Sequence, residues 1–186
     1  MPLPAKAESG AKEIALLGVF LAYTLVISLI ERLIPLSFTM PGLRLGLANV
    51  AILLALYLFP FSKAFLLLLM KCLLSAIFAG SPASLFYSLG GSLLSFGVML
   101  LLLAGLREQI SPLGISVAGA AFHNTGQILV ACLLFNSWAV LVYLPLLLLA
   151  GIVTGAVTGL LVRQLRPFLA AYLGHDSASK AHRKTG

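Results

Sequence analysis

The chain has 186 residues, of which 61% are hydrophobic and only 9% are charged, and its mean hydropathy is +1.10. Soluble domains carry about 25% charged residues, so the composition excludes a soluble domain and predicts an integral membrane protein. The formal net charge of +7 could suit nucleic acid, but most basic residues lie in the tails and short loops, as membrane orientation requires. We therefore expect the lipid bilayer, and no nucleic acid, as a partner.

Six apolar segments follow one another and predict an all-α integral membrane protein with six transmembrane helices. They cover about residues 14–34, 45–59, 63–80, 83–106, 113–136 and 138–162. A helix needs about 20 mostly apolar residues to cross a bilayer, so the second segment is short. We expect a cytoplasmic arm over residues 1–12, one membrane domain over 13–165, and a basic cytoplasmic tail over 166–186.

The distribution of Lys and Arg predicts the orientation. Six crossings put both termini on one side, and nine of the 12 basic residues fall on that side. Only Arg32 and Arg44 fall on the other side, and Lys71 lies within the third segment. The positive-inside rule therefore places both termini in the cytoplasm of a multi-pass membrane protein.

Small residues form stripes on three of the segments. In the first, the stripe consists of Ala11, Ala15, Gly18 and Ala22, spaced by four, three and four residues. Such a stripe suits either packing within the chain or docking on another membrane protein, because bare backbones approach closely in lipid. The fifth and sixth segments carry stripes for which we expect close helix packing. These are Gly114, Ala118, Ala121 and Thr125, and Gly151, Gly155 and Gly159.

Polar residues interrupt the apolar segments where a membrane helix rarely tolerates them. On the fifth segment, His123, Asn124 and Gln127 share one helix face. Lys71 sits in the middle of the third segment, where a lysine costs about 2.5–3.5 kcal/mol on insertion scales. We expect all four side chains to face protein or a ligand.

Given this orientation, most other polar groups fall in the outer half of the membrane. A candidate substrate site therefore contains Arg44, Asn49, Lys71, Tyr87, Ser88, His123, Asn124, Gln127 and Tyr143. Two fixed cations favour a small anionic or polar substrate. Glu31 is interpreted as an interfacial charge rather than a ligand group. Ser92 and Ser95 are interpreted as helix-packing residues.

Catalytic motifs are absent from the sequence, and we predict no enzyme activity, metal or cofactor. The single aspartate is Asp176, so the clustered carboxylates that hold magnesium on a diphosphate are missing. No P-loop occurs, so ATP-driven transport would need ATPase subunits on other chains. Cys72 and Cys132 lie in apolar segments, where we expect buried free thiols.

Four stretches together resemble the Gx transporter family of bacterial membrane proteins, also labelled heptaprenyl diphosphate synthase component I. They are PGLRLGLAN (41–49), FAGSPASLFYSLGG (78–91), HNTGQ (123–127) and YLPLLLLAGIVTG (143–155). This family is similar to the substrate-binding S components of energy-coupling factor (ECF) vitamin transporters. The resemblance implies a six-helix bundle in the bacterial inner membrane that binds its substrate from outside. It also implies a transmembrane coupling protein and two ATPases as partners, with the stripe of the first helix as docking face.

Two alternatives stay open. The family label suggests a noncatalytic membrane subunit associated with prenyl diphosphate synthesis, and a prenyl diphosphate is then one candidate ligand. A standalone proton-coupled carrier would instead use Lys71, His123 and Glu31 as a proton relay.

Overall fold

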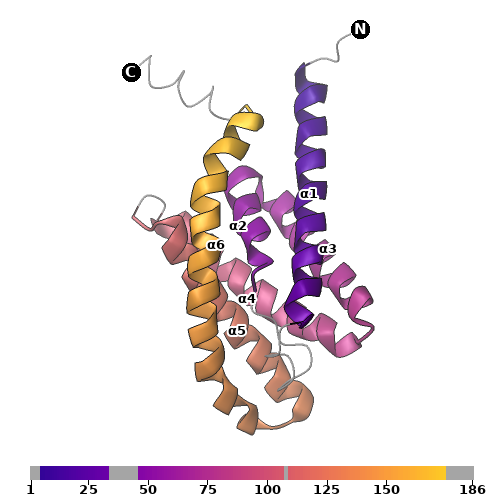
Figure 1. Cartoon of the computed structure of the whole chain (residues 1–186), viewed down its shortest axis with the longest axis vertical. Coiled ribbons are helices and arrows are strands. Elements are labelled where there is room, and N and C mark those ends of the chain that lie inside the picture. The colour runs from indigo at the N-terminus through magenta and orange to yellow at the C-terminus, as the bar shows by residue number, and fades with distance from the viewer. Residues whose placement is uncertain (1–4, 34–45, 107–108, 175–186) are drawn as a thin grey trace.

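A computed structural model describes residues 5–33, 46–106 and 109–174, and these ranges are helical without any strand. The elements are α1 (Ala5–Leu33), α2 (Asn49–Leu58), α3 (Phe61–Ala79), α4 (Pro82–Leu106), α5 (Pro112–Phe135), the 3-10 helix η2 (Trp138–Tyr143) and α6 (Leu144–Tyr172). They assemble into one bundle (Figure 1). The predicted all-α architecture is confirmed.

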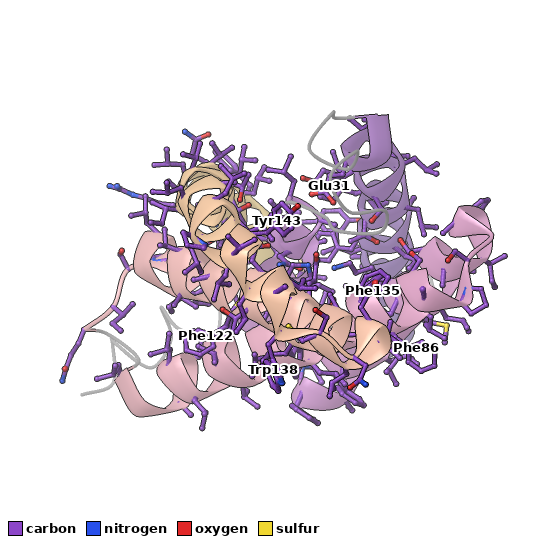
Figure 2. The ribbon with its side chains drawn as sticks, turned by 90° about the horizontal axis from the view of Figure 1, so that it is seen from below. Glu31, Phe86, Phe122, Phe135, Trp138 and Tyr143 are labelled. Carbon is purple, nitrogen blue, oxygen red and sulfur yellow. The ribbon has the colours of Figure 1, made fainter. Side chains whose placement is uncertain are left out.

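Five of the helical segments are long and apolar enough to cross a membrane: those of α1, α3, α4, α5 and the η2–α6 pair. Large apolar side chains cover much of the outside of the bundle, including Phe86, Phe122, Phe135 and Trp138 (Figure 2). An apolar exterior of this kind suits lipid. The chain is therefore a multi-pass membrane protein.

Helix α2 differs from the other helices in length and position. Its ten residues rise about 15 Å, about half of the hydrocarbon core, so α2 alone does not cross the bilayer. Eight of those residues are buried, and α2 contacts each of the other five α-helices. Because its sequence NVAILLALYL is apolar on all sides, it suits a core position. The short second segment is thus a helix surrounded by longer ones.

Close helix contacts build the α4–α5–α6 side of the bundle. A Cβ on Gly159 of α6 would lie 2.5 Å from Leu113 Cα of α5, and one on Gly155 would lie 2.8 Å from Val117 Cα. The glycines of α6 therefore pack against the α5 backbone, as expected. The stripe predicted on α5, Gly114, Ala118, Ala121 and Thr125, is only partly buried, and the α6 glycines lie against Leu113 and Val117.

Helix α1 packs more sparsely than α5. In the described ranges it contacts only α2 and α3, through a buried face that includes Leu16 and Phe20. Glu13 near its start forms an ion pair with Lys63 near the start of α3. The first turns of α1 and the last turns of α6 lie at the same end of the bundle (Figure 1). Which side of the membrane this end faces stays a prediction.

The end of the last helix differs from the predicted one. Helix α6 continues to Tyr172, ten residues past the predicted end of the sixth apolar segment at residue 162. Within this extension the Arg166 guanidinium lies 4.3 Å from the ring centroid of Tyr57 in α2. The last turns of α6 therefore stay attached to the bundle.

Candidate functional site

Lys71 is the centre of a buried polar arrangement. Its side chain is only 2% exposed, although α3 is otherwise apolar at this depth. The ammonium Nζ donates to Asn49 Oδ1 on α2 at 3.1 Å and to Ser92 Oγ on α4 at 3.3 Å. Three helices thus contribute one side chain each to this contact, and the predicted inward orientation of Lys71 is confirmed.

The fifth helix contributes a second polar pair. His123 Nε2 and Gln127 Nε2 are 2.6 Å apart, one helical turn from each other, and both side chains are buried. The Gln127 amide donates to the ring nitrogen when the imidazole proton is on Nδ1. The contact thus joins two buried side chains one turn apart on α5.

Two glycines bring the lysine group and the histidine pair together. A Cβ on Gly46 would lie 3.1 Å from Asn49 Nδ2 and 3.3 Å from His123 Cδ2. A Cβ on Gly91, next to Ser92, would lie 2.8 Å from Gln127 Cγ and 3.0 Å from His123 Cε1. We call the side chains Asn49, Lys71, Ser92, His123 and Gln127 the polar cluster.

Asn124 faces a different helix from its neighbour His123. Its Nδ2 donates to the Leu147 carbonyl of α6 at 2.5 Å, passing Gly151, whose Cβ would come within 2.7 Å of the same nitrogen. Asn124 thus faces α6, whereas His123 and Gln127 lie against Gly91 of α4. The prediction that all three side chains share one environment is wrong. Asn124 thus joins α5 to α6 instead of joining the polar cluster.

The other predicted site residues divide between different surroundings. Tyr87 is buried in an apolar group with Ile128 and Leu147, and Tyr143 packs partly buried against that group. Ser88 is buried, and its carbonyl accepts from Cys72 Sγ at 3.5 Å. Arg44 lies outside the described residues.

Glu31 is not a surface charge. Its side chain is 2% exposed, and its Oε1 accepts the backbone N–H of Leu47 at 2.5 Å. The interpretation of Glu31 as an interfacial charge is therefore wrong. The carboxylate instead joins the end of α1 to the turn before α2.

The small-residue stripe of α1 lies on the outside of the bundle. Ala11, Ala15, Gly18 and Ala22 are all exposed, and a Cβ on Gly18 would meet no described atom within 4 Å. Packing within the described part of the chain therefore does not account for the stripe. Lipid or another protein is left to cover it.

The sequence did not reveal one member of the polar cluster, Ser92, or the two glycines that lie against the cluster, Gly46 and Gly91. Ser92 was interpreted as a packing serine, although its hydroxyl contacts Lys71, and the roles of Gly46 and Gly91 were not recognised. Gly91 directly precedes Ser92, and a small residue beside a polar one on an apolar helix would have been the available signal.

Neither metal nor thiol chemistry finds support in the described residues. These ranges hold no group of three His, Cys, Asp or Glu side chains that could bind a metal ion. Cys72 and Cys132 are buried free thiols, as predicted. The cluster offers neutral donors and one ammonium group.

The sequence of residues 20–165 matches the family described as heptaprenyl diphosphate synthase component I. The chain belongs to this family. The matched range runs from the middle of α1 to near the end of α6 and includes the whole polar cluster. The family name implies a partner component in a complex. No curated protein and no solved structure matches the chain.

Proposed function

We propose that the chain is the substrate-binding membrane subunit of an uptake system, similar to an ECF S component, for a small anionic or polar molecule. The observation that carries this proposal is the burial of the Lys71 ammonium among polar side chains of α2 and α4, beside the His123–Gln127 pair. Ionisable groups inside membrane bundles are costly, and those that persist usually serve binding or transport.

One member of the cluster has an unused donor. Asn49 Nδ2 is buried and has no hydrogen-bond partner among the described residues. A buried donor without an acceptor costs about 1–3 kcal/mol. A ligand oxygen bound near Gly46 would accept from this amide and remove that cost.

The donors of the cluster fit an oxygen-rich anion. The Lys71 ammonium supplies charge, and the Asn49 and Gln127 amides supply directed N–H groups. Charge-assisted hydrogen bonds to carboxylate or phosphate oxygens are about twice as strong as neutral ones. We expect Arg44, predicted in the outer half of the membrane, to add a second cation.

Partner proteins would supply the energy. The sequence holds no P-loop, so the ATPases belong to other chains, and a coupling protein would connect them to this one. The exposed stripe of α1 is the docking face in this proposal, because nothing in the described chain covers Gly18. In the proposed orientation, both termini are cytoplasmic and the site opens outward.

Co-purification tests the proposal. The tagged chain should be isolated from its native membranes in mild detergent and its partners identified by peptide mass spectrometry. We expect a multi-pass coupling protein and two P-loop ATPases, and the isolated complex should hydrolyse ATP. Ala15→Trp should remove these partners, whereas Leu133→Trp, at an exposed site on α5, should retain them. Isolation of the chain without any ATPase contradicts the uptake function.

The family name favours a second candidate, a noncatalytic membrane subunit associated with prenyl diphosphate synthesis. In that case the co-purifying protein is a soluble prenyltransferase with aspartate-rich motifs, and the polar cluster receives the diphosphate group. The same isolation therefore separates the two candidates. Uptake by the chain alone in liposomes, abolished by a protonophore, would instead indicate a proton-coupled carrier.

A further inference from the structure

We infer that Glu31 of α1 is a positioning residue for the polar cluster, acting through the turn Gly46–Asn49 without touching the substrate. The inference rests on the proposed function only where it concerns ligand binding. It follows from where the Glu31 carboxylate lies and from what the turn carries.

The Gly46–Asn49 turn holds two features of the site within four residues. Gly46 adopts a left-handed backbone with φ +86° and lies against His123, and its carbonyl accepts the Asn49 N–H at 2.9 Å. The Asn49 side chain in turn accepts from Lys71 Nζ at 3.1 Å. A shift of this turn would therefore change both the lysine contact and the space beside the imidazole.

The N-terminus of α2 lacks a cap of its own. Ala48 occupies the N-cap position and has no side chain that can accept a hydrogen bond. Helix starts leave backbone N–H groups without intrahelical partners, and Ser, Thr, Asp or Asn usually accept one of them. Glu31 supplies an acceptor from α1 just before the helix, because its Oε1 binds at 2.5 Å the N–H of Leu47, the residue that precedes the N-cap. A carboxylate there also interacts favourably with the positive end of the helix dipole.

The neighbouring buried residue on α1 offers a matched control. Ser28 lies about one turn before Glu31 and is 1% exposed, and its hydroxyl has no hydrogen-bond partner among the described residues. Truncation of Ser28 thus perturbs the same helix face without removing a contact to the turn. An effect of replacing Glu31 that Ser28→Ala does not share is therefore assigned to the loss of the carboxylate.

The first measurement needs no substrate. In an Ala48→Cys background, the reaction rate of the new thiol with a maleimide reports how often the turn opens, because residue 48 is only 2% exposed. The native thiols of Cys72 and Cys132 are also buried. We expect Glu31→Leu to raise this rate at least fivefold. Glu31→Gln, which keeps a carbonyl acceptor, and Ser28→Ala should leave the rate within twofold of the parent. An unchanged rate in Glu31→Leu overturns the inference.

The second measurement uses inorganic diphosphate as the probe anion in calorimetric titrations of the protein in detergent. Glu31→Leu should weaken binding at least tenfold, while Glu31→Gln and Ser28→Ala stay within threefold of wild type. Unchanged binding in Glu31→Leu with a raised labelling rate limits Glu31 to a structural role and overturns the inference. No binding by wild type contradicts the anionic site, while the labelling result still decides the effect of Glu31 on the turn.

Folding is checked by size-exclusion chromatography and circular dichroism. If Glu31→Leu does not yield a helical monodisperse protein, Glu31→Asp replaces it in both measurements. The aspartate keeps the charge but is one methylene shorter, so it should not reach Leu47 N–H with the same geometry. We then expect the same directions of change, at least twofold in rate and threefold in affinity, and their absence overturns the inference.

Discussion

The small-residue stripes of α1 and α6 have nearly the same spacing and opposite surroundings. Gly155 and Gly159 lie against the α5 backbone, where an added Cβ would come within 2.8 and 2.5 Å of a Cα atom. Gly18 on α1 has no described neighbour within 4 Å of such a Cβ. Regularly spaced small residues allow a helix to approach another backbone closely. Which other residues of that helix are buried decides whether the neighbouring helix belongs to this chain.

The buried face of α1 explains the difference. Leu16, Phe20, Thr24, Ser28 and Glu31 recur at intervals of four, four, four and three, and all of them face the bundle. The alanine and glycine stripe therefore points outward. On α6, by contrast, Gly151, Gly155 and Gly159 are themselves the buried residues. Substitutions in α1, α5 and α6 test this difference.

The largest effect on folding is expected from Gly159→Ala. The new Cβ would lie 2.5 Å from Leu113 Cα, and since backbone cannot rotate away, α5 and α6 must separate. Overpacking of this kind typically costs about 1–3 kcal/mol. We expect a thermal unfolding midpoint in detergent lower by several degrees. Gly97→Ala on α4, with no neighbour within 4 Å, should be neutral or slightly stabilising. Equal midpoints for both variants would contradict the tight α5–α6 contact.

A smaller effect on stability is expected from Asn124→Leu. It removes the hydrogen bond to the Leu147 carbonyl, which is worth about 1 kcal/mol net. Because Asn124 faces α6, binding of the diphosphate probe should change less than threefold. Gln127→Leu, one turn away on α5, should instead weaken binding about tenfold with a similar loss of stability. If Asn124→Leu impairs binding more than Gln127→Leu, the assignment of Gln127 and not Asn124 to the polar cluster is wrong.

The smallest effect on folding is expected from Gly18→Leu. Its side chain extends into open space, so the unfolding midpoint should stay within about one degree of wild type. Partner binding should nevertheless be lost if the stripe is a docking face. The contrast with Gly159→Ala is direct, since both replace a glycine of a regularly spaced stripe. A large loss of stability in Gly18→Leu would indicate packing that the described residues do not show.

Much of the fold followed from the sequence because apolar length and charge act locally along the chain. The helix boundaries of α3, α4 and α5 lie within about two residues of their predicted positions. The end of α6 did not follow, since Arg166 was interpreted as the start of a tail, whereas it packs over Tyr57 of α2. That contact joins residues far apart in the sequence, which periodicity cannot reveal.

The site was predicted in part for the same reason. Burial of Lys71, His123 and Gln127 followed from the cost of polar groups in lipid. The division of His123 and Asn124 between two neighbours did not, because it depends on where α4 and α6 sit around α5. The burial of Glu31 was not predicted because its partner is a backbone N–H. A backbone N–H occurs in almost every residue, so the sequence does not indicate which one a carboxylate binds.

Binding of a substrate at Lys71 can be tested by native mass spectrometry. Wild type, Lys71→Met and Lys63→Met should be purified in parallel without prolonged washing. Lys63 lies two turns earlier on the same helix and pairs with Glu13 outside the polar cluster. We predict one small-molecule adduct on wild type and Lys63→Met, and its loss from Lys71→Met. The same adduct on Lys71→Met, or none on any of the three proteins, would contradict a substrate site at Lys71.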